Sequence, residues 1–142
     1  MKRLQSKKKK CSFHQSIKDF SSRRRKRDIL YYDWGNELYK KQNFRDAFEV
    51  FADGYYRYPE NKDFLNNTFV TFYNSLNINW QNKNWAQSKG LIEEMIDLQV
   101  LKDKDRNHIS GLLFNWSGYF NSVSDQKSKN EVQELMARIK ND

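Results

Sequence analysis

From Asp28 onward, apolar residues recur at spacings of three and four, and this spacing constrains the fold more than any other feature of the sequence. Such a period places apolar side chains on one face of an α-helix, whereas a half-buried strand would alternate with a period of two. The first two runs are Tyr31, Trp34 and Leu38, followed by Phe44, Ala47, Phe48, Phe51 and Tyr55. The pattern predicts two short amphipathic helices at the start of an all-α fold.

Three residues mark where these helices are expected to begin and end. Asn43 precedes the second run and Asn61 precedes a third, and the short amide of asparagine can bond an exposed backbone group at a helix start. Pro59, the only proline, follows the second run and cannot donate the next helical hydrogen bond. We therefore expect one helix to stop before Pro59 and another to begin after Asn61.

Seven residues in this part of the chain follow the spacing of a known helical repeat. They are Tyr31, Trp34, Gly35, Leu38, Ala47, Phe51 and Pro59, and with them residues 28–61 resemble one tetratricopeptide repeat. The resemblance implies that Gly35 and Ala47 are small because two antiparallel helices approach closely there. Gly54 is a third small residue, and glycine costs roughly 1 kcal/mol relative to alanine inside a helix, which favours a close approach at this position too. Tyr31 in place of Trp and Gln42 in place of a turn glycine are the departures from the family pattern.

Two further helix pairs are expected beyond residue 61, with a polar turn over residues 80–84 inside the first of them. About seven residues are inserted relative to a 34-residue repeat, which two extra helical turns in the first helix would absorb. A shift of 44 residues superposes Phe69 on Leu113, Phe72 on Trp116, Leu76 on Phe120, Leu91 on Leu135, Ile92 on Met136 and Met95 on Ile139. We predict three helix pairs, residues 28–61, 62–102 and 103–142, stacked as a short right-handed α-solenoid. A plain helical bundle whose first hairpin meets the repeat spacing by accident is the alternative.

The charge of the chain divides it at residue 27. Residues 1–27 hold 12 Lys and Arg but only one acidic residue, Asp19, a formal charge of +11. Residues 28–142 hold 14 basic and 17 acidic residues, a formal charge of −3. Blocks of like charge resist compaction, so the sequence predicts a disordered basic tail over residues 1–27 and a folded, mildly acidic domain over residues 28–142.

The tail carries two basic clusters with a spacer between them. They are Lys7, Lys8, Lys9 and Lys10, and then Arg23, Arg24, Arg25, Lys26 and Arg27. The arrangement resembles a two-part nuclear import signal. It also suits a nucleic-acid arm whose affinity falls steeply with salt, or contact with an anionic membrane to which Phe13, Ile17 and Phe20 would add apolar area. A solubilising leader without a partner is the fourth interpretation, and the sequence leaves all four open.

Residues on the other face of each first helix form the predicted binding surface. They are Tyr32, Asn36, Tyr39 and Lys40 in the first unit and Asn66, Asn67, Val70, Tyr73 and Asn74 in the second. Side-chain amides both donate and accept hydrogen bonds, so they can pair with a peptide backbone, and tyrosine rings add contact area at low entropic cost. We predict a groove that binds a peptide or helix of another protein. An equally weighted interpretation is that this surface only reflects a chain with 15 asparagines.

One subset of the tetratricopeptide family grips the terminal carboxylate of chaperones with two asparagines and basic partners. Asn36 and Asn67 resemble those asparagines in spacing. Tyr32 replaces the first lysine of that subset, however, and Asn107 and Gly111 stand where Lys and Arg are needed. The sequence therefore argues against a chaperone tail as the ligand.

Catalytic and cofactor chemistry is not expected. Cys11 is the only cysteine, His14 and His108 are the only histidines, and Cys11-x2-His14 lacks the second pair of ligands that a zinc site needs. We predict no enzyme activity, metal, cofactor or small-molecule substrate. No apolar run approaches the ~18 residues that span a bilayer, and no apolar stretch follows the basic start. We therefore expect an intracellular protein, cytoplasmic or, in a eukaryote, nuclear.

Overall fold

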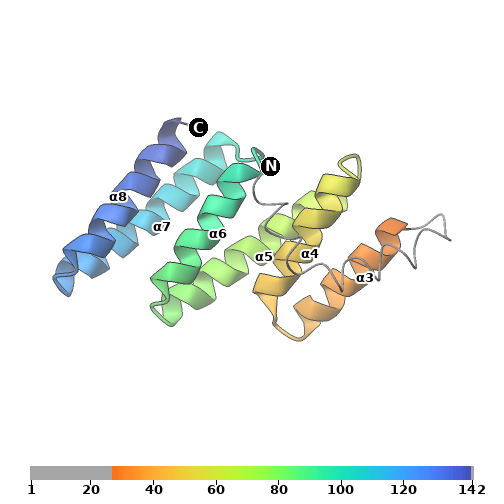
Figure 1. Ribbon diagram of the computed structural model, residues 1–142, viewed down its shortest axis with the longest axis horizontal. Helices are drawn as coiled ribbons and strands as arrows, with labels where there is room; N and C mark the ends of the chain where they lie inside the picture. Colours follow the sequence, from red (N-terminus) through yellow and green to blue (C-terminus); the bar gives the residue numbers. More distant parts are fainter. Residues whose placement is uncertain (1–26, 142) are drawn as a thin grey trace. The chain divides into compact units, whose positions relative to one another are not determined.

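The computed structural model describes residues 27–141, and most of them lie in helices (Figure 1). In chain order the helices are α3 (Arg27–Lys40), α4 (Phe44–Arg57), α5 (Lys62–Gln81), α6 (Trp85–Asp97), α7 (Asp103–Ser122) and α8 (Gln126–Asn141). No strand occurs in this range, so the all-α class that the apolar period predicts is confirmed. The tail expected over residues 1–27 lies outside the described residues, apart from the backbone of Arg27.

The chain divides into two compact units at residue 78. The N-terminal unit, described over residues 27–78, contains α3, α4 and most of α5. The C-terminal unit, described over residues 79–141, contains the last turn of α5 together with α6, α7 and α8. None of the helices between residues 27 and 141 is both long enough and apolar enough to cross a membrane.

The core of the N-terminal unit depends on glycines that lie against aromatic rings. Tyr31, Phe51 and Phe64 are almost completely buried there. A Cβ atom on Gly35 would overlap the ring of Phe51, and one on Gly54 would lie 2.8 Å from the ring of Phe64. The close approach expected at both glycines is therefore confirmed.

The core of the C-terminal unit is an aromatic cluster around Trp116. The centroid of the Trp116 ring lies 4.9 Å from that of Trp80, 5.3 Å from that of Trp85 and 5.5 Å from that of Phe120. Trp80 belongs to α5, so the expectation of a polar turn beginning at residue 80 is wrong. The turn occupies residues 82–84, and the ammonium group of Lys83 lies 3.4 Å from the centroid of Trp80. This cation–π contact stabilises the end of α5.

The three turns that join α3 to α4, α5 to α6 and α7 to α8 share one backbone conformation. Their left-handed residues are Gln42, Lys83 and Ser124, with φ values of 60°, 52° and 59°. The next residue in each turn, Asn43, Asn84 or Asp125, donates its backbone N–H to a carbonyl five residues earlier, at 2.8 to 2.9 Å. A tight turn of this kind reverses the chain, so α3 packs antiparallel to α4, and α7 packs antiparallel to α8.

Helix starts follow the expected signals, with one difference. Asn61 accepts a hydrogen bond from the backbone N–H of Asp63 at 3.0 Å, and α4 ends at Arg57, before Pro59. Asn43 does lie at the start of α4, but its amide donates to Asp46 at 2.9 Å and caps no backbone group.

Equivalent helices are 41 residues apart. The first helices α5 and α7 begin at Lys62 and Asp103, and the second helices α4, α6 and α8 begin at Phe44, Trp85 and Gln126. The 44-residue shift that superposes the apolar residues is therefore wrong by three residues. A step of three residues is close to one helical turn of 3.6, so it keeps the same face toward the core and leaves the apolar pattern almost unchanged.

Candidate partner-binding surface

The predicted residues of α3 lie on its exposed side. Tyr32 and Tyr39 are 36% and 38% exposed, Lys40 is exposed and Asn36 is half-buried. Their neighbour Tyr31, which faces the core, is only 1% exposed. The expected separation between packing residues and outward residues therefore holds on this helix.

The predicted residues of α5 are also accessible. Asn66 and Val70 are exposed, and Asn67, Tyr73 and Asn74 are half-buried. Thr68 and Phe72, which directly follow Asn67 and precede Tyr73 in the chain, face the core and are completely buried. The two helices thus present nine accessible residues of the predicted set, all within the N-terminal unit.

One hydrogen bond joins the outward sides of α3 and α5, and Tyr32 of α3 also contacts the buried core residue Phe64 of α5. The amide of Asn74 donates a hydrogen bond to the hydroxyl oxygen of Tyr39 at 3.5 Å. The ring of Tyr32 lies 6.4 Å, centroid to centroid, from that of Phe64 at the start of α5. Tyr39 and Asn74 are therefore neighbours, and we call the nine predicted residues on the accessible sides of the two helices the α3–α5 surface.

Several amides of the α3–α5 surface are available to a ligand. Among residues 27–141, the side chains of Asn36, Asn66 and Asn67 make no hydrogen bond. Each amide offers one acceptor and two donors, which match the carbonyl and N–H groups of a peptide backbone. These three amides are the strongest polar feature of the surface.

Two of the three first helices, α5 and α7, are also unusual in charge, whereas α3 carries Asp33, Glu37 and Lys40. Residues 64–82 and 107–124 contain no Asp, Glu, Lys or Arg, although these types make up 31% of the chain. The first stretch lies almost wholly in α5 and the second almost wholly in α7, whereas α4, α6 and α8 all carry charges of both signs. The α5 part of the surface, with its free amides, suits an uncharged stretch of polypeptide better than an acidic or basic one because it offers no counter-charge, and Lys40 on α3 adds a single positive charge.

The 41-residue step reveals an equivalent face on α7 that the sequence reasoning missed. Asn107, Phe114 and Asn115 stand 41 residues after Asn66, Tyr73 and Asn74. Tyr32, Tyr73 and Phe114 form a series at this same step, with one accessible aromatic residue on each first helix. The recurrence of the turn residues Asn43, Asn84 and Asp125 is the signal that would have located them.

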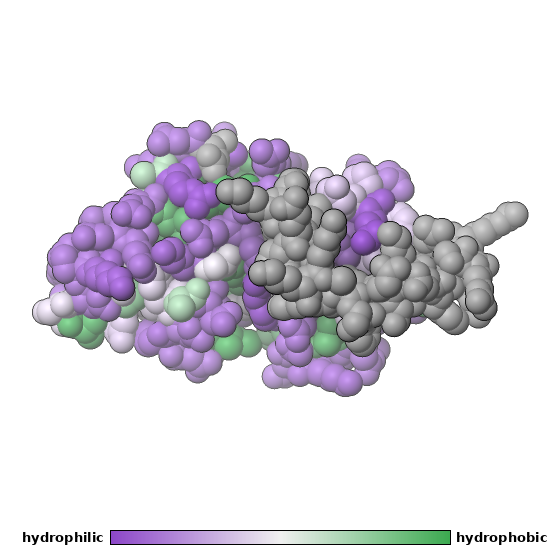
Figure 2. Space-filling model, viewed as in Figure 1, coloured by the Kyte–Doolittle hydropathy of each residue, from purple (hydrophilic) through white to green (hydrophobic). Residues whose placement is uncertain are grey.

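The predicted basic clusters, Lys7–Lys10 and Arg23–Arg27, lie outside the described side chains. In Figure 2 the visible described surface is mostly hydrophilic, with separate hydrophobic patches. Among the described residues, the candidate binding surfaces are the α3–α5 surface and the accessible residues Asn107, Phe114 and Asn115 of α7.

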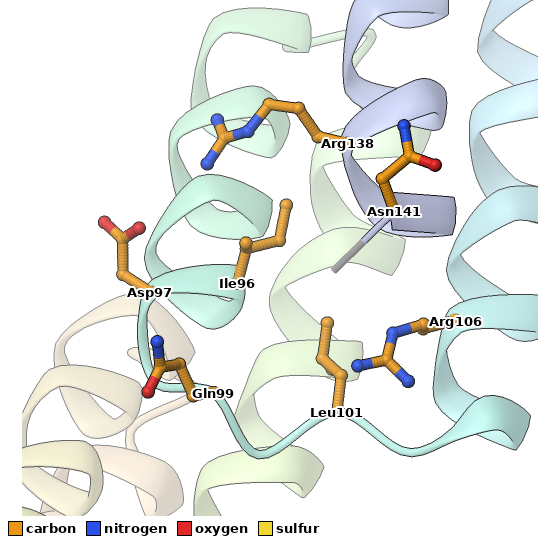
Figure 3. Close-up of a pocket in the computed structure, with 7 residues that line it drawn as sticks. All are labelled: Ile96, Asp97, Gln99, Leu101, Arg106, Arg138 and Asn141. Carbon is orange, nitrogen blue, oxygen red and sulfur yellow. The ribbon is translucent and has the colours of Figure 1, made fainter.

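A pocket of about 620 Å³ lies in the C-terminal unit, where α6 ends and α7 begins (Figure 3). Its lining residues are Ile96, Asp97, Gln99, Leu101, Arg106, Arg138 and Asn141. Both arginines already have acidic partners, because Arg106 lies 3.4 Å from Asp103 and Arg138 lies 3.4 Å from Glu93. Two of the three charged lining residues therefore already form ion pairs within the C-terminal unit.

The possible metal ligands between residues 27 and 141 are not clustered. No three His, Cys, Asp or Glu side chains in this range are placed to hold a metal ion. The pKa of Asp125 is lowered, because the backbone N–H of Ser128 donates to its carboxylate at 3.0 Å. This bond caps the start of α8, so the shift has a structural cause.

Comparison with family models, with curated protein sequences and with solved structures finds no match to this chain.

Proposed function

We propose that the chain is a non-catalytic protein-interaction module of tetratricopeptide-like helix pairs, which binds a peptide or helix of another protein. The pairs would stack as a short right-handed solenoid, with the first helices lining its concave side. The common turn conformation and the 41-residue step support such a repeat.

The observation that carries the proposal is the α3–α5 surface. It combines free amides at Asn36 and Asn67 with the accessible rings of Tyr32 and Tyr39, and α5 adds no charge after Asp63. A peptide backbone laid along it would satisfy the amides, and its side chains would contact the rings. The ligand class that fits best is an uncharged segment.

Peptide selection tests the proposal directly. Peptides selected from a random library on the full chain should bind Asn36→Ala and Asn67→Ala more weakly, by roughly 1 to 3 kcal/mol for each buried hydrogen bond left unpaired. Gln133→Ala on α8 is the matched control, since it removes an exposed amide far from α3 in sequence. Unchanged affinity in both asparagine variants, with circular dichroism intact, would contradict the proposal.

A second candidate function acts through the basic tail. The charge of +11 over residues 1–27 suits nucleic acid or an anionic membrane. Deleting residues 1–26 separates the two functions, because RNA or vesicle binding would vanish while captured peptides remain bound. Loss of both activities would make the tail the functional part.

A further inference from the structure

Phe114 stands out on α7 as an apolar residue without cover. Its exposed fraction of 69% is the highest among the large apolar side chains of the described residues. Asn107, Gly111, Phe114 and Gly118 follow one another at steps of four, three and four, so they lie along one line of the helix. We call these four residues the α7 face.

The two glycines of the α7 face are not required by any neighbour between residues 27 and 141. A Cβ atom at Gly111 or Gly118 would meet no atom within 4 Å, whereas Gly35 and Gly54 are required by adjacent rings. Glycine weakens the interior of a helix relative to alanine. An external neighbour that approaches the backbone of α7 closely would give both glycines a function.

The lack of charge on the α7 face limits which kind of partner can pack against it. The α7 face lies within residues 107–124, which carry no Asp, Glu, Lys or Arg. A strongly charged partner would lose hydration against this face and gain no counter-charge. A second copy of the chain presents the same neutral face, so the two match in charge without repulsion.

Shape also favours a second copy. We propose that α7 is a self-association surface, where the α7 helices of two copies pack antiparallel and Phe114 of each lies over Gly111 of the other. In an antiparallel pair with this spacing, the same twofold axis places Asn107 over Gly118 in both directions. Every larger residue of the α7 face then meets a glycine, so the face is complementary to itself.

Sedimentation velocity of the full chain over a wide range of concentration measures the association. Phe114→Ser should weaken self-association roughly 30-fold or more, the loss typical of a central aromatic anchor. Tyr56→Ser is the matched control, because Tyr56 is 54% exposed on α4 and should leave the dissociation constant unchanged.

Replacing the two glycines provides a second test, because the thermal stability of the monomer should rise while self-association should weaken. Gly111→Gln and Gly118→Gln introduce a good helix former into open space, so the dilute monomer should unfold at a higher temperature. The same variants should lose self-association, because the longer side chain fills the space that Phe114 or Asn107 of the other copy needs. A purely structural role for these glycines would not move the two readouts in opposite directions.

Two results would overturn the proposal. A wild-type chain that stays monomeric at the highest concentration would leave the α7 face to a different partner. A dimer with the same dissociation constant in Phe114→Ser and both glutamine variants would use another surface. Neither result bears on peptide capture by Asn36 and Asn67, which lie in the N-terminal unit.

Discussion

The two units fill their cores in different ways. Rings contact rings in both cores, but only in the N-terminal unit do rings also pack against glycine, with Phe51 over Gly35 and Phe64 over Gly54. In the C-terminal unit, rings pack against rings around Trp116, and a Cβ atom on Gly90 would meet nothing within 4 Å. The resemblance to the tetratricopeptide repeat depends on small residues at fixed positions. Residues 28–61 contain such a small residue at Gly35, whereas no glycine of α6 or α7 lies against a ring.

The largest effect is expected at the centre of the aromatic cluster. Trp116 is 3% exposed and contacts Trp80, Trp85 and Phe120, so Trp116→Ala should lower the free energy of unfolding by about 3–5 kcal/mol. Trp34→Ala is the matched control, because Trp34 is only partly buried and should cost less. Urea denaturation followed by circular dichroism measures both, and equal losses would show that Trp116 is no special centre.

Replacing glycine by alanine should lower the free energy of unfolding in the N-terminal unit and raise it in the C-terminal unit. In Gly35→Ala the added methyl overlaps the ring of Phe51, which costs about 1–3 kcal/mol, and the helix preference of alanine returns roughly 1 kcal/mol. The net effect is a loss of stability. Gly90→Ala meets open space and should instead stabilise by about 0.5–1 kcal/mol.

A double variant tests the cause of the loss at Gly35. Shortening the facing ring with Phe51→Leu should make Gly35→Ala less harmful than it is in the wild-type background. If the cost of Gly35→Ala is the same in both backgrounds, overlap with the ring is not its origin.

The smallest effect concerns the cap of α8. The pKa of Asp125 lies below its ordinary value of 3.8, so its carboxylate stabilises the fold above that pH and loses the effect as the pH falls through the lowered pKa. Asp125→Asn keeps an acceptor for the N–H of Ser128 but has no charge to lose. Its stability should therefore decline less than the wild-type stability on acidification. Urea denaturation at neutral and acidic pH measures both proteins. If the midpoint falls by the same amount in the wild type and in Asp125→Asn, the prediction is contradicted.

Sequence reasoning succeeded wherever one helical face was enough to decide. The packing roles of Gly35 and Gly54, the end of α4 before Pro59 and the outward position of Tyr32 all follow from spacing and residue size. Each of these depends on one helix or on two helices that follow each other in the chain.

The repeat length was harder, because an error of three residues returns almost to the same face of a helix. Apolar spacing therefore cannot separate 44 from 41, whereas the turn residues Asn84 and Asp125 can. The polar neighbours of Trp80 predict a turn at this residue, but its ring packs on Trp116. A step of 44 residues does not relate Tyr73 to Phe114. Only the step of 41 residues shows that the two are equivalent.

The shared turn also bears on how a chain like this one can grow. Gln42, Lys83 and Ser124 have little in common chemically, yet each adopts the same left-handed conformation before a short polar residue. The amino acid at the left-handed position can therefore vary while the turn still reverses the direction of the chain. Gene duplication of residues 62–102 would copy a segment that already carries its own reversal, and the protein could lengthen in whole modules.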